Sequence, residues 1–156
     1  MHVVILSPGR FKHGPEQDLF ERYRERCPWR LELVELTLKR AVAKGALRAA
    51  ESRLIESRLS PGRPLVVLDA AGELATSDAL ARRLGGWRDA GTGGASFVIG
   101  GAEGVDDALR RRADWRLALG RLTWPHLLVR AMLAEQLYRA ATILAGHPYH
   151  RGAGEG

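Results

Sequence analysis

Short apolar segments alternate with amphipathic segments along the whole chain of 156 residues. The apolar segments end in turn residues such as Pro-Gly or Gly-Gly, which is typical of buried strands. The segments between them repeat apolar residues at every third or fourth position, which predicts helices. This alternation favours an α/β fold, with helices on both faces of a mostly parallel sheet of five or six strands. The expected strands lie near 1–9, 31–36, 64–72, 95–101 and 115–123, and the expected helices near 15–27, 41–59, 77–89, 106–112 and 125–146.

The chain has the length of one domain with its own core and is too short for several. Hydrophobic residues make up 46% of it and charged residues 27%, which is an ordinary balance for a globular protein. We expect a single domain over residues 1–151, followed by a flexible glycine-rich tail, 152–156. The single cysteine, Cys27, excludes an internal disulfide and any CxxC site.

The start of the sequence has no basic stretch followed by a long apolar run, so we expect no signal peptide. No apolar run approaches the roughly 20 residues that cross a bilayer. These features predict a cytoplasmic protein without a membrane partner.

The charge balance is unusually basic, with 24 Lys and Arg against 18 Asp and Glu and a net charge of +6. Only three of the basic residues are lysines, and arginine is the side chain best suited to bidentate phosphate contacts. Arg40, Lys44 and Arg48 recur every four residues, and the expected helix would place them on one face. Such a face is either simply solvated or the footprint of a nucleic-acid backbone. A GC-rich genome would also enrich arginine without any functional meaning.

Three strand exits have the residues of a candidate ligand site. Ligands of open parallel sheets bind beyond the carboxyl ends of the strands, and these exits are expected to meet there. The exits begin at Leu68, at the paired glycines Gly100 and Gly101, and in the stretch from Leu117 to Pro125. Paired glycines let a ligand approach the backbone closely, although a tight turn alone would explain them. The pattern is neither GxGxxG nor GxxxxGK[ST], so the dinucleotide and Walker fingerprints are absent.

The last predicted helix, from His126 to Gly146, is apolar almost all round. A helix of this kind is buried in a core or in an interface. Because a small domain offers few places to cover every face of it, we expect a homodimer contact here. Glu135 and Arg139 are spaced to pair along this helix.

The helix is followed by His147-Pro148-Tyr149-His150-Arg151, an unusual concentration of functional side chains. A zinc site would need at least three good ligands, and His126 is the nearest third histidine. We therefore expect no metal. Acid–base and phosphate-contacting roles suit this segment better.

The strand exit VIGGAEG, the segment LTWPHLLVRAMLAEQLYRA and the terminal HPYHR together closely resemble one known family. This is the bacterial 23S rRNA pseudouridine N3-methyltransferase family, which belongs to the SPOUT class of knotted methyltransferases. The resemblance covers essentially the whole chain up to Arg151. It implies an α/β fold with a trefoil knot near the carboxyl end, a homodimer, and 23S rRNA in the ribosome as the partner.

The resemblance also implies S-adenosylmethionine as the cofactor and assigns roles to particular residues. By motif match, the cofactor contacts fall on Leu68, Gly101, Gly120, Arg121, Leu122, Thr123, Trp124 and Pro125. The matching positions for substrate binding or catalysis are Arg139, Tyr149, His150 and Arg151. Leu127 and the length of the loop before the strand at 95 depart from the family pattern, but neither is one of these residues.

Elementary chemistry agrees with this hypothesis. A sulfonium is already an activated methyl donor, so the transfer needs alignment of donor and nucleophile rather than a metal. The N3–H of pseudouridine is mostly protonated at neutral pH, so a base or a stabilising cation is required. The sequence does not say which residue would be that base.

Two other hypotheses remain at this stage. The chain could be a ribosome- or RNA-binding protein without enzymatic activity on the same fold, although the glycine loop and HPYHR are both intact. It could also be a flavodoxin-like nucleotide-binding enzyme, although the arginine surplus and the missing phosphate loop disfavour this.

Overall fold

The sheet predicted from the sequence is present in a computed structural model, which describes residues 1–149. In this part of the chain, five strands and five helices follow one another. The strands are β1 (His2–Pro8), β2 (Arg30–Leu36), β3 (Leu65–Leu74), β4 (Gly94–Ile99) and β5 (Trp115–Ala118). The helices are α1 (Pro15–Arg26), α2 (Leu47–Glu56), α3 (Ser77–Asp89), α4 (Asp107–Arg112) and α5 (His126–Leu144).

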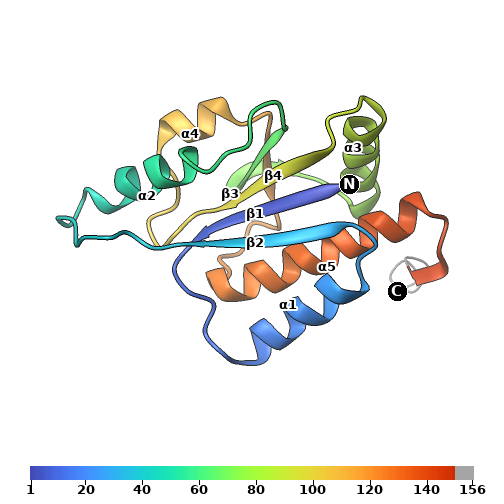
Figure 1. Ribbon diagram of the computed structural model, residues 1–156, viewed down its shortest axis with the longest axis horizontal. Coiled ribbons are helices and arrows are strands. Elements are labelled where there is room, and N and C mark those ends of the chain that lie inside the picture. Colours follow the sequence, from blue (N-terminus) through green and yellow to red (C-terminus); the bar gives the residue numbers. More distant parts are fainter. Residues whose placement is uncertain (150–156) are drawn as a thin grey trace.

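All strand pairs are parallel, and the strand order is β2-β1-β4-β3-β5. Successive residues of β1 point to opposite faces of the sheet and into two separate apolar clusters. Val3 and Ile5 face the larger cluster, under α1, α3 and α5, whereas Val4 and Leu6 face the smaller one, under α2 and α4. Figure 1 shows α2 and α4 on one side of the sheet and α1 and α5 on the other. The predicted α/β class with helices on both faces is confirmed.

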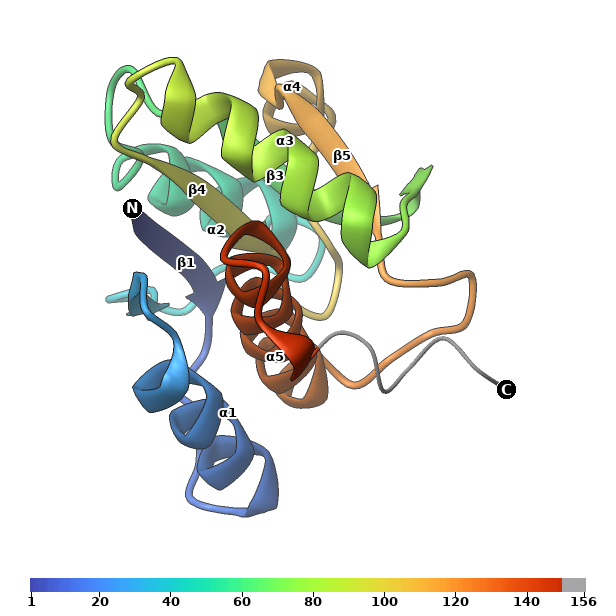
Figure 2. The ribbon, with the colours of Figure 1, turned by 90° about the vertical axis from the view of Figure 1, so that its right-hand side faces the viewer.

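The long helix α5 lies between α1 and α3, as Figure 2 shows. Nine of its residues are buried within the single chain, which contradicts the premise that one small domain cannot cover this helix. The expectation of a homodimer therefore needs another basis. A partly exposed stripe remains on α5, and it includes Leu128, Met132, Glu135 and Arg139.

One buried arginine joins α5 to the end of β1. The side chain of Arg130 is fully buried, and its Nη2 donates to the carbonyl oxygens of Pro8 (2.8 Å) and Gly9 (3.0 Å). Its Nε donates to the hydroxyl of Ser7 at 3.1 Å. Burial lowers the pKa of this guanidinium, and Glu35, whose carboxylate lies 3.8 Å away, opposes the shift. These contacts fix the backbone where β1 leaves the sheet.

Two predicted boundaries are wrong. The helix expected at 41–59 is only α2, Leu47–Glu56, so Arg40 and Lys44 lie in an irregular connection and share no helical face with Arg48. Gly45 adopts a positive φ of 91° there, which breaks a helix. The strand expected at 115–123 ends at Ala118, because the chain turns at Gly120 with φ 113°.

Some expectations stay predictions. Strand order and pairing do not establish how the connections are threaded, so the trefoil knot is still an expectation from the family resemblance. The tail 152–156 lies outside the described residues. Over residues 1–149, no helix combines the length and the apolar character that crossing a membrane requires.

Candidate functional site

The glycine loop that follows β4 is a tight turn folded on itself. The amide of Gly104 donates to the carbonyl of Gly101 at 3.0 Å, and Gly104 adopts φ 71°. A Cβ on Gly100 would lie 2.8 Å from the backbone of Gly104, so only glycine fits there. A Cβ on Gly101 would instead meet the carboxyl group of Glu51 on α2, behind the loop. Gly100 is therefore needed for the shape of the loop, whereas a side chain at Gly101 would displace Glu51.

The exit of β3 is organised around one carboxylate. Asp69 accepts from the amide of Ala71 at 2.9 Å and from Arg116 at 3.0 Å, and Arg110 lies 3.2 Å away. Burial opposes ionisation of this carboxyl, but the amide and the two guanidinium groups outweigh it and hold its pKa below the usual value. Asp69 is thus a fixed anion and a poor base.

The third exit is the irregular segment 119–125 that leads from β5 to α5. Its Arg121 reaches back to β3 and donates from Nη1 to the carbonyls of Ala70 (2.5 Å) and Gly72 (2.9 Å). The indole of Trp124 donates to the carbonyl of Leu119 at 3.2 Å. Leu122 is 70% exposed, so a large apolar side chain is left at the surface of this segment.

The three exits meet around one pocket of about 520 Å³. It includes seven of the eight residues expected to contact a cofactor: Leu68, Gly101, Gly120, Leu122, Thr123, Trp124 and Pro125. The eighth, Arg121, does not line the pocket. Its hydrogen bonds to carbonyls of β3 hold the segment 119–125 against this strand. A cleft of this size with mainly apolar walls and a few polar groups suits a small organic ligand.

The pocket also contains residues that sequence reasoning did not assign, notably Asp69 and His126. His126 is the first residue of α5, and burial followed by the charge of Arg130 lowers its pKa below 6.5. The imidazole is therefore neutral at physiological pH. Its position beside Pro125, at the start of a predicted helix, is the signal that could have placed it in the site.

The positions expected to serve catalysis lie at the opposite end of α5. Arg139 pairs with Glu135 at 2.9 Å, and the Tyr149 hydroxyl donates to the same carboxylate at 3.3 Å. The Tyr149 ring packs edge-on against Tyr138 with 4.7 Å between centroids, and the guanidinium of Arg26 lies over both rings. The structure thus brings Arg139 and Tyr149 together. His150 and Arg151 lie outside the described residues.

The pKa values of Arg139 and Tyr149 in this cluster are both raised. The hydrogen bonds that Arg139 donates to Glu135, opposed by burial, raise the pKa of the guanidinium and keep it charged. Burial, the neighbouring Tyr23 and the charge of Glu135 raise the pKa of Tyr149 far above its usual value. Tyr149 is therefore a hydrogen-bond donor and a poor base. Tyr149 also packs on the core, so the segment after Gly146 contributes to the packing of the domain.

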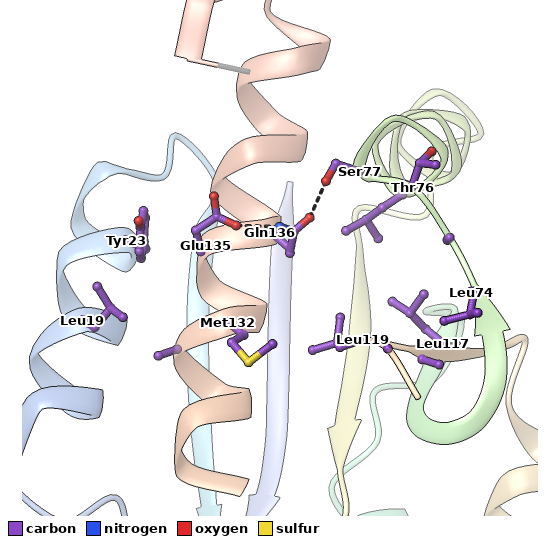
Figure 3. A pocket seen from close by; sticks show the side chains of 15 residues that line it. Leu19, Tyr23, Leu74, Thr76, Ser77, Leu117, Leu119, Met132, Glu135 and Gln136 are labelled. Carbon is purple, nitrogen blue, oxygen red and sulfur yellow. Dashed lines mark hydrogen bonds between the residues drawn. The ribbon is translucent and has the colours of Figure 1, made fainter. Parts of the chain in front are cut away.

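His126 and the cluster of Arg139 and Tyr149 lie at opposite ends of α5. His126 begins α5 and Arg139 lies 13 residues further on, which corresponds to about 20 Å along a helix axis. Between them lies a second hollow, an apolar groove of about 610 Å³. Figure 3 shows Leu19 and Tyr23 of α1 on one side of this groove, Met132 and Glu135 of α5 in the middle, and Leu74 on the far side.

Among the described residues, no three His, Cys, Asp or Glu side chains gather in a way that could hold a metal ion.

The fold and the pocket define a parallel α/β protein with its candidate site beyond the carboxyl ends of the strands. The model of a family described as predicted SPOUT methyltransferase matches residues 1–150, and the chain belongs to this family.

Curated relatives match over nearly the full length. The chain is 51% identical over 151 residues to a protein of Rhodospirillum centenum, with 97% of this chain and 99% of the relative covered. It is 49% identical to a protein of Paramagnetospirillum magneticum and 49% identical to one of a Bradyrhizobium species, with the same coverage. Each of the three is named ribosomal RNA large subunit methyltransferase H.

The lowered pKa of His126 predicts a pH dependence of cofactor binding. If the pocket takes S-adenosylmethionine, as the family resemblance implies, a protonated His126 would place a second positive charge beside the sulfonium of this ligand. We expect the affinity to be highest where His126 is neutral and to fall severalfold as the pH drops through the lowered pKa. Calorimetric titration between pH 5 and 8 measures this, and His126→Gln should remove the dependence. A variant with the same dependence as the wild type would assign it to another group.

Proposed function

We propose that the chain is an S-adenosylmethionine-dependent methyltransferase that methylates N3 of a pseudouridine in 23S rRNA of the ribosome. The observation that carries this is the pocket, where three strand exits bring together seven of the eight expected cofactor residues. Family membership supports methyl transfer as the reaction, and the names of the relatives support ribosomal RNA as the substrate. Such an enzyme works in the bacterial cytoplasm.

The pocket suits the cofactor in several respects. The glycine loop lets a ligand lie against the backbone, and the apolar walls from Leu68, Ile99 and Leu119 can cover a flat adenine ring. Within the pocket, these groups hold the methyl donor in place, which is the main task in such a transfer.

The reaction removes one proton and moves one methyl group. The bond from sulfur to the methyl carbon breaks and leaves a neutral thioether, while a bond from N3 to the methyl carbon forms. The N3 proton must leave with a base, and the charge that develops on the uracil oxygens needs a cation nearby. Arg139 is permanently charged and suits the second task.

The same geometry supports a homodimer. Since the pocket and the Arg139 cluster lie about 20 Å apart along α5, one protomer cannot apply both to one nucleotide. A two-fold axis at the apolar groove would bring the cluster of one protomer to the pocket of its partner. Exposed Leu74, Leu122 and Trp124 add apolar surface for such a contact.

The predicted dimer is tested by its mass. Light scattering at micromolar concentration should give about twice the 17.1 kDa of one chain. Met132→Asp places a charge in the groove and should give monomers, whereas Arg53→Asp, on α2 across the sheet, should not. A wild-type monomer would exclude the shared site.

The function itself is tested by methyl transfer to ribosomes from a strain that lacks the modification. Calorimetry should show that the chain binds S-adenosylmethionine, and mass spectrometry should locate one new methyl group on a 23S rRNA pseudouridine. A chain that binds ribosomes but not the cofactor would instead be a non-enzymatic RNA-binding protein. Binding of a flavin or nucleotide without methyl transfer would point to a flavodoxin-like enzyme.

A further inference from the structure

The two strands that do not contribute to the cofactor pocket end in basic segments. The β1–α1 connection, 9–14, carries Arg10 and Lys12. The β2–α2 connection and the first turn of α2, 37–48, carry Lys39, Arg40, Lys44 and Arg48. All six side chains are exposed, and neither segment contains an acidic residue. Because the sheet is parallel, these segments lie at the same edge as the pocket.

Within residues 1–149, none of the six forms an ion pair. Some arginines elsewhere, such as Arg24 and Arg110, are paired, and others, such as Arg53, are not. Unpaired cations gathered on one surface repel one another and create a positive potential. An anion from outside the chain would relieve this repulsion.

The second segment borders an open hollow of about 520 Å³, which we call the basic hollow, and contributes Lys39, Arg40 and Lys44 to its lining. Its lining consists of Gly9, residues 37–44, Leu47 and Glu103. Glu103 belongs to the glycine loop, whose Gly101, Ala102 and Gly104 line the cofactor pocket. The loop is therefore a wall shared by the two hollows. A polymer bound in the basic hollow would pass directly beside the cofactor pocket.

The floor of the basic hollow is held in place. The amide of Gly9 donates to the carbonyl of Leu36 at 2.8 Å, which joins the ends of β1 and β2. The buried Arg130 holds the carbonyls of Pro8 and Gly9 from below. The backbone at the ends of β1 and β2 is thus fixed. The segment 37–46, which carries Lys39, Arg40 and Lys44, begins at this fixed edge and has no regular structure. Such an arrangement combines a fixed position with side chains that adapt to a ligand.

We propose that the basic hollow binds the phosphodiester backbone of the substrate RNA beside the target nucleotide, and so places that nucleotide over the cofactor pocket. This inference rests on the proposed function, because it assumes that the substrate is RNA. Lysine and arginine neutralise phosphates and release condensed counterions, which gives binding a steep salt dependence. Contacts of this kind fix the register of the nucleic acid without reading its sequence.

Glu103 gives the proposal a second, opposite expectation. It is the acid among the residues that line the basic hollow, and it is exposed. A phosphate in the hollow would be repelled by this carboxylate, so its removal should strengthen RNA binding. A purely structural basic surface would show no such gain.

The test compares two triple variants with the same change in charge. One replaces Lys39, Arg40 and Lys44 by Gln in the basic hollow. The control replaces the exposed Arg53, Arg58 and Arg82 by Gln, away from it. Methyl transfer to ribosomes that lack the modification gives KM and kcat, sedimentation gives ribosome binding at several salt concentrations, and calorimetry gives cofactor affinity.

We expect the first variant to raise KM about tenfold or more, with kcat and cofactor affinity nearly unchanged. The slope of log K against log salt should fall by about two, as expected for three lost phosphate contacts. The control variant should change KM and the salt slope much less. Glu103→Gln should lower KM. Equal effects in both triple variants would reduce the result to net charge and overturn the proposal, as would an unchanged KM and salt slope. If the wild type transfers no methyl group, the proposed function fails. The salt slope of ribosome binding, compared between the two triple variants, still shows whether the basic hollow binds RNA.

Discussion

Removal of all residues after Gly146 is expected to lower methyl transfer by at least about a hundredfold, the scale of a lost acid–base group. The deletion takes away Tyr149, His150 and Arg151, whereas the cofactor pocket lies at the other end of α5. Cofactor affinity should therefore be almost unchanged. Because the edge-on packing of Tyr149 on Tyr138 is lost, stability should fall by about 1 kcal/mol. Activity assays, calorimetry and thermal unfolding measure the three effects.

A shorter deletion is the matched control. Removal of residues 152–156 leaves HPYHR intact and should preserve activity. Tyr149→Phe keeps the ring packing but loses the hydrogen bond to Glu135, so it separates packing from chemistry. Near-normal turnover by the longer deletion would show that the tail is dispensable and would direct attention to Arg130, Glu135 and Arg139.

The second large effect is expected from Gly100→Ala. The added methyl group would lie 2.8 Å from the backbone of Gly104, and backbone cannot rotate away as a side chain can. The glycine loop must open, which should weaken cofactor binding by about 10- to 100-fold, the equivalent of the 1–3 kcal/mol that overpacking costs. Calorimetry measures the loss.

Gly86→Ala is the matched control, because Gly86 is exposed on α3 and has no atom near the position of an added Cβ. It should bind cofactor normally. In contrast, Gly101→Val acts indirectly, since its side chain meets Glu51 rather than the pocket. Unchanged affinity in a folded Gly100→Ala variant would mean that the loop does not hold the cofactor.

The layout of the fold could be predicted because its signals are local. Buried strands and amphipathic helices each show a short-range pattern, and parallel strands place their carboxyl ends at one edge. The meeting of Leu68, Gly101 and Pro125 at one pocket follows from that rule. In contrast, the helix predicted at 41–59 was too long because Val42, Ala46, Ala50 and Leu54 have helical spacing. Spacing alone does not reveal that Val42 is 39% exposed and that Gly45 breaks the helix.

The parts of the site that could not be predicted depend on distant contacts. No local pattern indicates that Arg130 is buried against β1 or that Glu51 lies behind the glycine loop. The distance between the pocket and the Arg139 cluster could not be predicted either, because it depends on the direction in which α5 crosses the sheet. The roles of Arg139 and Tyr149 came from family resemblance, and the structure adds their shared carboxylate, Glu135.

The buried contacts of Arg130 have a consequence for how the protein is made. They join residues more than 120 positions apart, and β1, one of the first segments synthesised, also needs β4 as a neighbour. A nascent chain therefore cannot complete its core until α5 has been translated. Folding can finish only after almost the whole chain has been synthesised. An incomplete chain would keep the apolar face of β1 exposed to proteases and chaperones. Full-length synthesis is thus built into the fold as a condition for a stable product.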